Sequence, residues 1–120
     1  MKNLFSSIRC AFNGIRYALA TERNIRIHLI AFILVLIASF ILEISKTDFL
    51  LILAISAVLF SLELTNTAIE RLADKVSPEY DAQIGVVKDV MAGAVLVASI
   101  FAIIIGLFIF LAPLLQLFQP

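Results

Sequence analysis

Three long runs of apolar residues constrain the fold of this 120-residue chain more than any other feature. The runs cover residues 29–44, 49–62 and 90–115, and segments richer in polar residues, 45–48 and 63–89, separate them. A helix needs about 17–25 mostly apolar residues to cross the hydrocarbon core of a membrane. Hydrophobic residues make up 62% of the chain, well above the roughly 45–50% of a soluble domain. We therefore expect an all-α integral membrane protein with a single domain over residues 1–120.

The apolar pattern predicts three transmembrane helices, over about residues 26–44, 47–73 and 85–112. A short turn around Lys46 separates the first two. Ser77-Pro78 ends the second, since proline disfavours α geometry in the residue before it. So few helices enclose little space within one subunit, and we expect the chain to oligomerise.

The residues before the first span predict an amphipathic helix on the membrane surface, over about residues 3–22. Apolar side chains recur there at a spacing of three or four, which places them on one face of a helix. Basic side chains recur every seven residues beside that face, where they can reach anionic headgroups. The apolar positions are Phe5, Ile8, Phe12, Ile15 and Leu19, and the basic ones are Lys2, Arg9, Arg16 and Arg23.

The distribution of lysine and arginine predicts the orientation in the membrane. Five of these residues lie within residues 1–26, whereas the first loop holds only Lys46. The second loop region holds Arg71, Lys75 and Lys88, and the C-terminal end holds none. We expect the N-terminus and the second loop to be cytoplasmic and the C-terminus to lie outside. The net charge of zero gives no reason to expect a nucleic-acid partner.

A row of polar residues continues the second apolar run. In one helix, Glu63, Asn66, Glu70 and Asp74 follow at i, i+3, i+7 and i+11, which stacks them on one face. Carboxylates at a membrane boundary are costly, so they are candidates for a functional site. Glu70 and Asp74 could instead be solvated at a helix end, but Glu63 follows unbroken apolar residues.

Two further polar clusters belong to the same cytoplasmic side, residues 21–28 and residues 79–89. With the row on the second helix they offer carboxylates for a hard cation, a lysine for phosphate and an aromatic ring for stacking. Mg²⁺ takes one or two protein carboxylates besides phosphate oxygens and water. Phosphoryl transfer needs little more than a metal, positive charge and a positioned base.

Each of these residues also has a simpler interpretation. Glu22 and Arg26 could form only an i, i+4 ion pair, and His28 could hydrogen-bond at headgroup level. Tyr80 could be an aromatic of the membrane interface, and Lys88-Asp89 could be interfacial anchors. The chain has no GxxxxGK[ST] motif, and its single cysteine and single histidine argue against a zinc site.

Taken together, these motifs resemble the small prokaryotic diacylglycerol kinase/undecaprenol kinase family. The resemblance runs from about Phe5 to Leu111. It implies homotrimers of three-span subunits with shared active sites in the bacterial inner membrane. It also implies transfer of the γ-phosphate of MgATP to a lipid alcohol. The motifs are Glu63-x-x-Asn66-Thr-Ala-Ile-Glu70-x-x-x-Asp74, Ser77-Pro-Glu79-Tyr80 and Lys88-Asp89.

The resemblance also implies roles for individual residues. Glu63 matches the general base for the lipid hydroxyl, with Asn66 beside it. Glu22 and Glu70 match the carboxylates that coordinate the metal. The remaining matches form two groups. The nucleotide group is Asp74, Glu79, Tyr80, Asp81, Lys88 and Asp89, and the group facing the lipid substrate is Asn24, Arg26 and His28, together with Glu63.

Differences from the diacylglycerol branch of the family favour undecaprenol as the lipid. That branch has Glu where this chain has His28, His where it has Asp81, and Tyr where it has Cys10. The run over residues 22–28 and the Ser77-Pro78 pair resemble the undecaprenol branch. The alternative function is a small cation transporter or channel subunit whose acidic row binds the ion. An ion path should have polar residues at several depths, whereas residues 90–115 are apolar.

Overall fold

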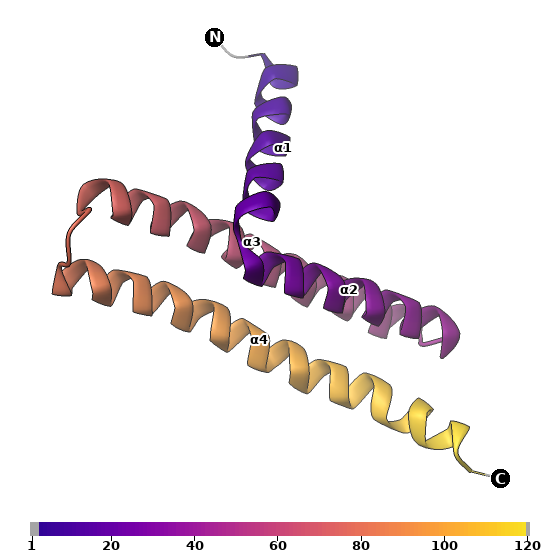
Figure 1. Cartoon of the computed structure of the whole chain (residues 1–120). Helices are drawn as coiled ribbons and strands as arrows, with labels where there is room; N and C mark the ends of the chain where they lie inside the picture. The colour runs from indigo at the N-terminus through magenta and orange to yellow at the C-terminus, as the bar shows by residue number, and fades with distance from the viewer. Residues whose placement is uncertain (1–2, 120) are drawn as a thin grey trace.

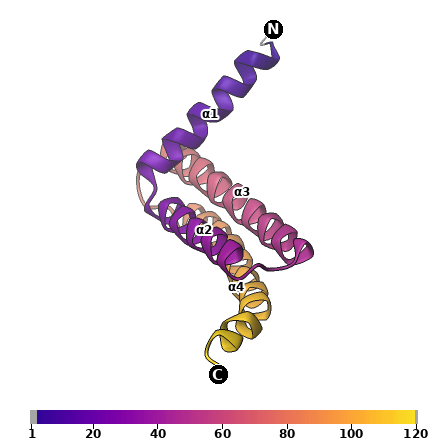
Figure 2. The same ribbon diagram turned by 90° about the vertical axis from the view of Figure 1, so that its right-hand side faces the viewer.

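The computed structural model describes residues 3–119, which form four α-helices (Figure 1). These are α1 (Leu4–Thr21), α2 (Arg23–Ile41), α3 (Lys46–Val76) and α4 (Ala82–Leu117). The helices α2, α3 and α4 form an elongated bundle, and α1 leaves it at a steep angle (Figures 1 and 2). The all-α prediction is confirmed. Lys2, counted above among the basic residues of the surface helix, lies outside the described residues.

Three of the helices are long and apolar enough to cross a membrane. Their most apolar stretches have mean hydropathies of 2.2 in α2, 2.0 in α3 and 3.0 in α4. α3 and α4 run antiparallel and make the most extensive contact, and α2 packs on α3 (Figure 2). α4 continues to Leu117 with Pro113 inside its last turns, where the missing proline N–H removes one backbone hydrogen bond.

Side-chain caps define where three of the helices begin. Asn3 Oδ1 accepts a hydrogen bond from the Ser6 amide at the start of α1, and Ser45 Oγ accepts one from the Asp48 amide at the start of α3. Asp81 Oδ1 accepts from two amides in the first turn of α4. Such caps satisfy amides that have no partner inside the helix, and each contributes about 1 kcal/mol.

A single residue separates α1 from α2. Glu22 adopts an extended conformation (φ −103°, ψ 126°) and is the C-cap of α1 and the N-cap of α2. Arg26, from the first turns of α2, donates from Nη1 to the carbonyls of Leu19 (2.9 Å) and Ala20 (3.0 Å) at the end of α1. The arginine therefore helps to fix the direction in which α1 leaves the bundle.

Most of the apolar surface of the bundle faces outward. Large apolar residues such as Phe40 (73% exposed) and Phe108 (85% exposed) are mostly exposed, although the Phe40 ring also lies 5.9 Å from the Phe49 ring of α3. An apolar surface of this extent needs lipid or other protein chains around it. Few residues form the interior, and their apolar members in the described chain are Ala18, Ile25, Ile52, Leu59, Ala73, Ala98 and Ile109.

Candidate active site

Glu63 is a charged residue buried inside the described bundle. It lies in α3 at the end of the apolar run and is only 2% exposed. Its Oε1 lies 3.0 Å from Nε2 of His28, on α2. The two atoms are at ion-pair distance, but this oxygen has no aligned hydrogen-bond donor. A carboxylate buried in this way is costly unless it is paired, so the contact with His28 is central to the site.

Asn66 and Glu70 continue the polar row along α3. Asn66 donates from Nδ2 to Glu70 Oε1 at 3.4 Å, one helical turn away. The carbonyl oxygen Oδ1 of Asn66 is buried and has no partner within the described chain. Buried acceptors in native proteins nearly always have a donor. Glu63 Oε1 and Asn66 Oδ1 are therefore placed to accept hydrogen bonds from a ligand, from water or from another chain.

Arg71, on α3, forms an ion pair with Glu22, although Arg71 is not among the candidate site residues predicted from the sequence. Arg71 Nη2 lies 2.9 Å from Glu22 Oε1, and the guanidinium also lies over the Tyr17 ring, 5.6 Å from its centroid. The simple Glu22–Arg26 pair considered above is not formed. Glu22 is an extended cap rather than a helical residue, so the i, i+4 geometry does not apply.

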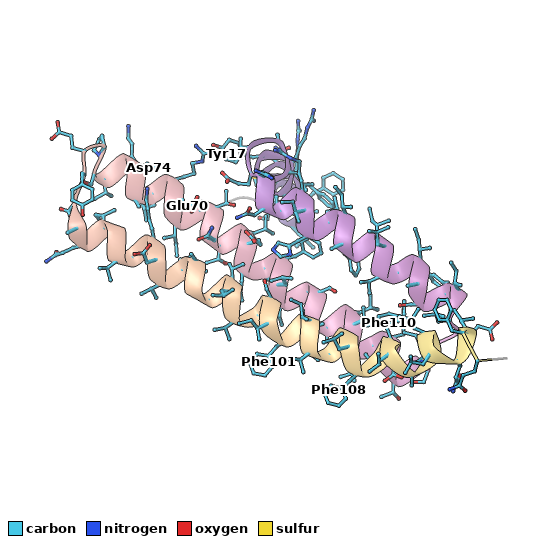
Figure 3. The ribbon with its side chains drawn as sticks, turned by 60° about the horizontal axis from the view of Figure 1, so that its bottom comes forward. Tyr17, Glu70, Asp74, Phe101, Phe108 and Phe110 are labelled. Atoms are coloured by element: carbon cyan, nitrogen blue, oxygen red, sulfur yellow. The ribbon has the colours of Figure 1, made fainter. Side chains whose placement is uncertain are left out.

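No sequence signal would have found this cluster. Arg71 and Glu22 are 49 positions apart, and Tyr17 lies on a third element, α1. Figure 3 shows Tyr17, Glu70 and Asp74 at the end of the bundle where α1 meets it, with Phe101, Phe108 and Phe110 farther along α4. The polar part of the chain is thus concentrated at one end of the apolar bundle.

The predicted nucleotide residues are only partly brought together. Asp74 and Lys88 form an ion pair that joins α3 to α4. Asp81 uses its side chain to cap α4, and Tyr80 is 94% exposed. Asn24, Glu79 and Asp89 are also exposed, and within residues 3–119 their side chains form no hydrogen bond or ion pair with the other predicted site residues.

The carboxylates of Glu22 and Glu70 fit a hard cation. No three His, Cys, Asp or Glu residues of the described chain are close enough together to hold a metal by themselves. Glu22 and Glu70 are nevertheless both near enough to Glu63 to interact with it electrostatically. Mg²⁺ takes one or two protein carboxylates and completes its shell with phosphate oxygens and water. The oxygen donors present therefore suit Mg²⁺ when a phosphate-bearing ligand is bound.

An apolar groove of about 420 Å³ extends along the bundle from His28. It is bounded by α2 and α4, which do not pack on each other, and by α3 between them. On α2 it extends from Ile27 to Val35, and its polar lining consists of His28, Ser56 and Ser99. A second cavity, of about 480 Å³, lies between α1 and α3 beside Tyr17 and Arg71. The first is suited to a hydrocarbon chain, and it begins next to the His28–Glu63 contact.

Comparison with known proteins gives consistent matches over nearly the whole chain. The family described as prokaryotic diacylglycerol kinase matches residues 9–110. A diacylglycerol kinase of Synechocystis sp. is 40% identical over 116 residues, which are 96% of this chain and 66% of that protein. An undecaprenol kinase of Bacillus subtilis is 39% identical over 114 residues, which are 95% of this chain and 93% of that protein.

Proposed function

This chain belongs to the prokaryotic diacylglycerol kinase family, and from that premise we propose that it phosphorylates a lipid alcohol at the surface of a membrane. It is a lipid kinase, as are the proteins that it resembles. The observation that carries the proposal is a buried carboxylate, Glu63, beside the end of an apolar groove. The groove would hold the hydrocarbon chain, and the hydroxyl would then lie near the carboxylate. The alternative of a cation transporter has no support from the relatives.

In this proposal Glu63 is the general base that accepts the proton of the lipid hydroxyl. A base must lie within hydrogen-bond reach of the proton that it takes. The unpaired Asn66 Oδ1 could accept a hydrogen bond from the same hydroxyl or from a water beside it. The lipid hydroxyl is in the membrane and the nucleotide is in water. A site at the membrane boundary holds both in one place, so that their reaction no longer depends on a chance encounter.

We expect ATP to be the phosphate donor and Mg²⁺ its metal, held by Glu22 and Glu70. The metal, when bound, supplies positive charge to the phosphate oxygens. Arg71 contacts Oε1 of Glu22, so Oε2 remains open to a further ligand. Lys88, on α4, pairs with Asp74, which lies one helical turn from Glu70 on α3. Lys88 would bind a phosphate either in place of Asp74 or together with it. Tyr80 is exposed and free to stack on the base.

Undecaprenol should be the better lipid, and diacylglycerol a slower substrate or none. The undecaprenol-like run over residues 22–28 includes His28, which the structure places at the end of the groove where the hydroxyl would enter. The measurement is kcat/KM for both lipids in one detergent, because discrimination is a ratio of these values. His28→Glu should shift the ratio toward diacylglycerol.

The lipid comparison separates the family assignment from the substrate assignment. A preference for diacylglycerol of tenfold or more would contradict the choice of undecaprenol while leaving the kinase activity in place. An unchanged ratio in His28→Glu would show that this residue does not select the lipid. Thr65→Ala is a suitable control, because Thr65 is exposed, lies outside the groove lining and has its hydroxyl bonded within α3 to the Ser61 carbonyl. Both lipids should lose or retain activity equally in that variant.

We further propose that the kinase is a homotrimer with active sites shared between subunits. The active sites and the N-terminus would face the cytoplasm. The outward-facing apolar surface of α2 and α4 and the two unpaired acceptors of Glu63 and Asn66 support a neighbouring chain at the site. Mixing Glu63→Gln subunits with Glu22→Gln subunits should then restore some activity. Some of the shared sites would combine an intact Glu63 from one subunit with an intact Glu22 from another. Mixed oligomers that are verified by affinity tags and remain inactive would place each site within one chain.

A further inference from the structure

A buried base needs a route by which its proton leaves. Glu63 is shut away from water by α2 and α3, with only 3% of its side chain exposed. If it accepts a proton from the lipid hydroxyl and keeps it, the carboxyl group cannot act in the next turnover. Bound lipid in the adjacent groove would shield the group further, because the groove begins at its neighbour His28.

His28 is the titratable group in contact with Glu63, through Nε2 and Oε1 at 3.0 Å. The other charged groups that face the pair are Glu70, from α3, and Glu22, from the junction of α1 and α2. α4 contributes apolar residues and Ser99 to the groove beside it. The basic side chains nearby are bound elsewhere within the described chain, namely Arg26 to two carbonyls of α1, Arg71 to Glu22 and Lys88 to Asp74.

His28 also reaches the surface, which Glu63 does not. Its side chain is 23% exposed, compared with 3% for that of Glu63. His28 therefore offers a path from Glu63 to water, since its Nε2 lies 3.0 Å from the carboxylate and its side chain is partly exposed.

We propose that His28 is a positioning residue that relays the proton of the lipid hydroxyl from Glu63 to the water outside. The proposal rests on the role of Glu63 as the base. In the step at Glu63, the hydroxyl O–H bond breaks and its proton goes to the carboxylate. The alcohol oxygen forms a bond to the γ-phosphorus, and the bond from that phosphorus to the β-phosphate oxygen breaks, leaving its electron pair on ADP.

The relay then restores the carboxylate. The proton passes from the Glu63 carboxyl group to Nε2 of His28, in the tautomer that carries the ring hydrogen on Nδ1. The imidazolium gives its Nδ1 proton to water, which leaves the ring hydrogen on Nε2, where it donates to the Glu63 carboxylate. Proton exchange with water then returns the hydrogen to Nδ1 and restores the tautomer that accepts from Glu63. No oxidant or further reactant is needed, and Glu63 is ready for the next lipid.

The variant His28→Gln tests the relay because glutamine keeps a hydrogen-bond donor for Glu63 but cannot carry a proton. In rapid-quench experiments we expect one phosphorylated lipid per active site at nearly the parent rate, followed by a slow steady state. The steady-state kcat should fall about 10–100-fold, less than the ~10²–10⁴ expected for loss of a general base. Added imidazole should restore part of the steady-state rate and leave the first turnover unchanged.

Two controls separate this proposal from the one on which it rests. Imidazole should not affect the parent enzyme, whose own relay is intact, and it should not rescue Glu63→Gln, which lacks the base. If Glu63→Gln retains activity, the proposed base is wrong, whatever His28 does. If Glu63→Gln is inactive while His28→Gln keeps its full steady-state rate, or has a slow first turnover that imidazole does not rescue, the relay is wrong.

Discussion

Replacing Glu63 with glutamine should abolish phosphorylation while leaving ATP binding and the assembly of the protein mostly intact. The amide has nearly the size of the carboxylate, so the packing between α2 and α3 should change little. It cannot accept the hydroxyl proton, and loss of a general base typically lowers the rate by ~10²–10⁴. The measurement is the single-turnover rate of lipid phosphorylation with purified protein in mixed micelles.

A matched control is Glu43→Gln, which makes the same chemical change at an exposed position before α3, beyond the opposite end of the bundle. Its rate should equal that of the parent enzyme. Size-exclusion chromatography and equilibrium binding of a fluorescent ATP analogue should give the same results for both variants. Activity of Glu63→Gln within a factor of a few of the parent would remove this residue from the base role.

Replacing Glu22 or Glu70 with glutamine should raise the magnesium concentration needed for activity. Each substitution removes an anionic oxygen donor, which a hard cation prefers. Losing even an outer-shell partner of a metal typically costs about 10–100-fold in affinity, so losing a direct ligand should cost at least as much. The measurement is the concentration of Mg²⁺ that gives half-maximal rate at saturating ATP and lipid.

A measurement of metal binding that needs no catalysis separates the loss of a metal ligand from other effects of the substitutions on activity. Binding of Mn²⁺ to the protein with a non-hydrolysable ATP analogue can be followed by electron paramagnetic resonance, and both variants should bind it more weakly. Glu43→Gln again provides the control. An unchanged metal requirement and unchanged Mn²⁺ binding in both variants would contradict the assignment of Glu22 and Glu70 as ligands.

Hydropathy was enough to predict most of the architecture, for a physical reason. A spanning helix satisfies its own backbone hydrogen bonds, so its position depends on a local run of apolar residues rather than on distant partners. The second and third apolar runs accordingly lie within α3 and α4, and the first lies in α2 as far as Ile41, where that helix ends. Glu63 could be recognised in the same way, because a carboxylate that follows an unbroken apolar run is costly wherever the other helices lie.

Contacts between helices could not be predicted in this way. Spacing rules connect residues on one helix, as they do for Asn66 and Glu70, which are indeed in contact. They say nothing about how α2 is rotated toward α3, which decides that His28 faces Glu63. A Glu22–Arg26 pair at i, i+4 requires Glu22 to be helical, whereas the chain bends there and the carboxylate turns to Arg71.

The one-residue junction at Glu22 makes α1 and α2 mechanically dependent on each other. A longer linker would let each helix settle separately, but here Arg26 also holds the last carbonyls of α1. Spanning helices tilt to match the thickness of the bilayer around them. A change in the tilt of α2 must therefore swing α1 and shift Glu22 at the pivot. The acyl-chain length of the surrounding lipids would in this way change the position of Glu22, although those lipids do not contact it.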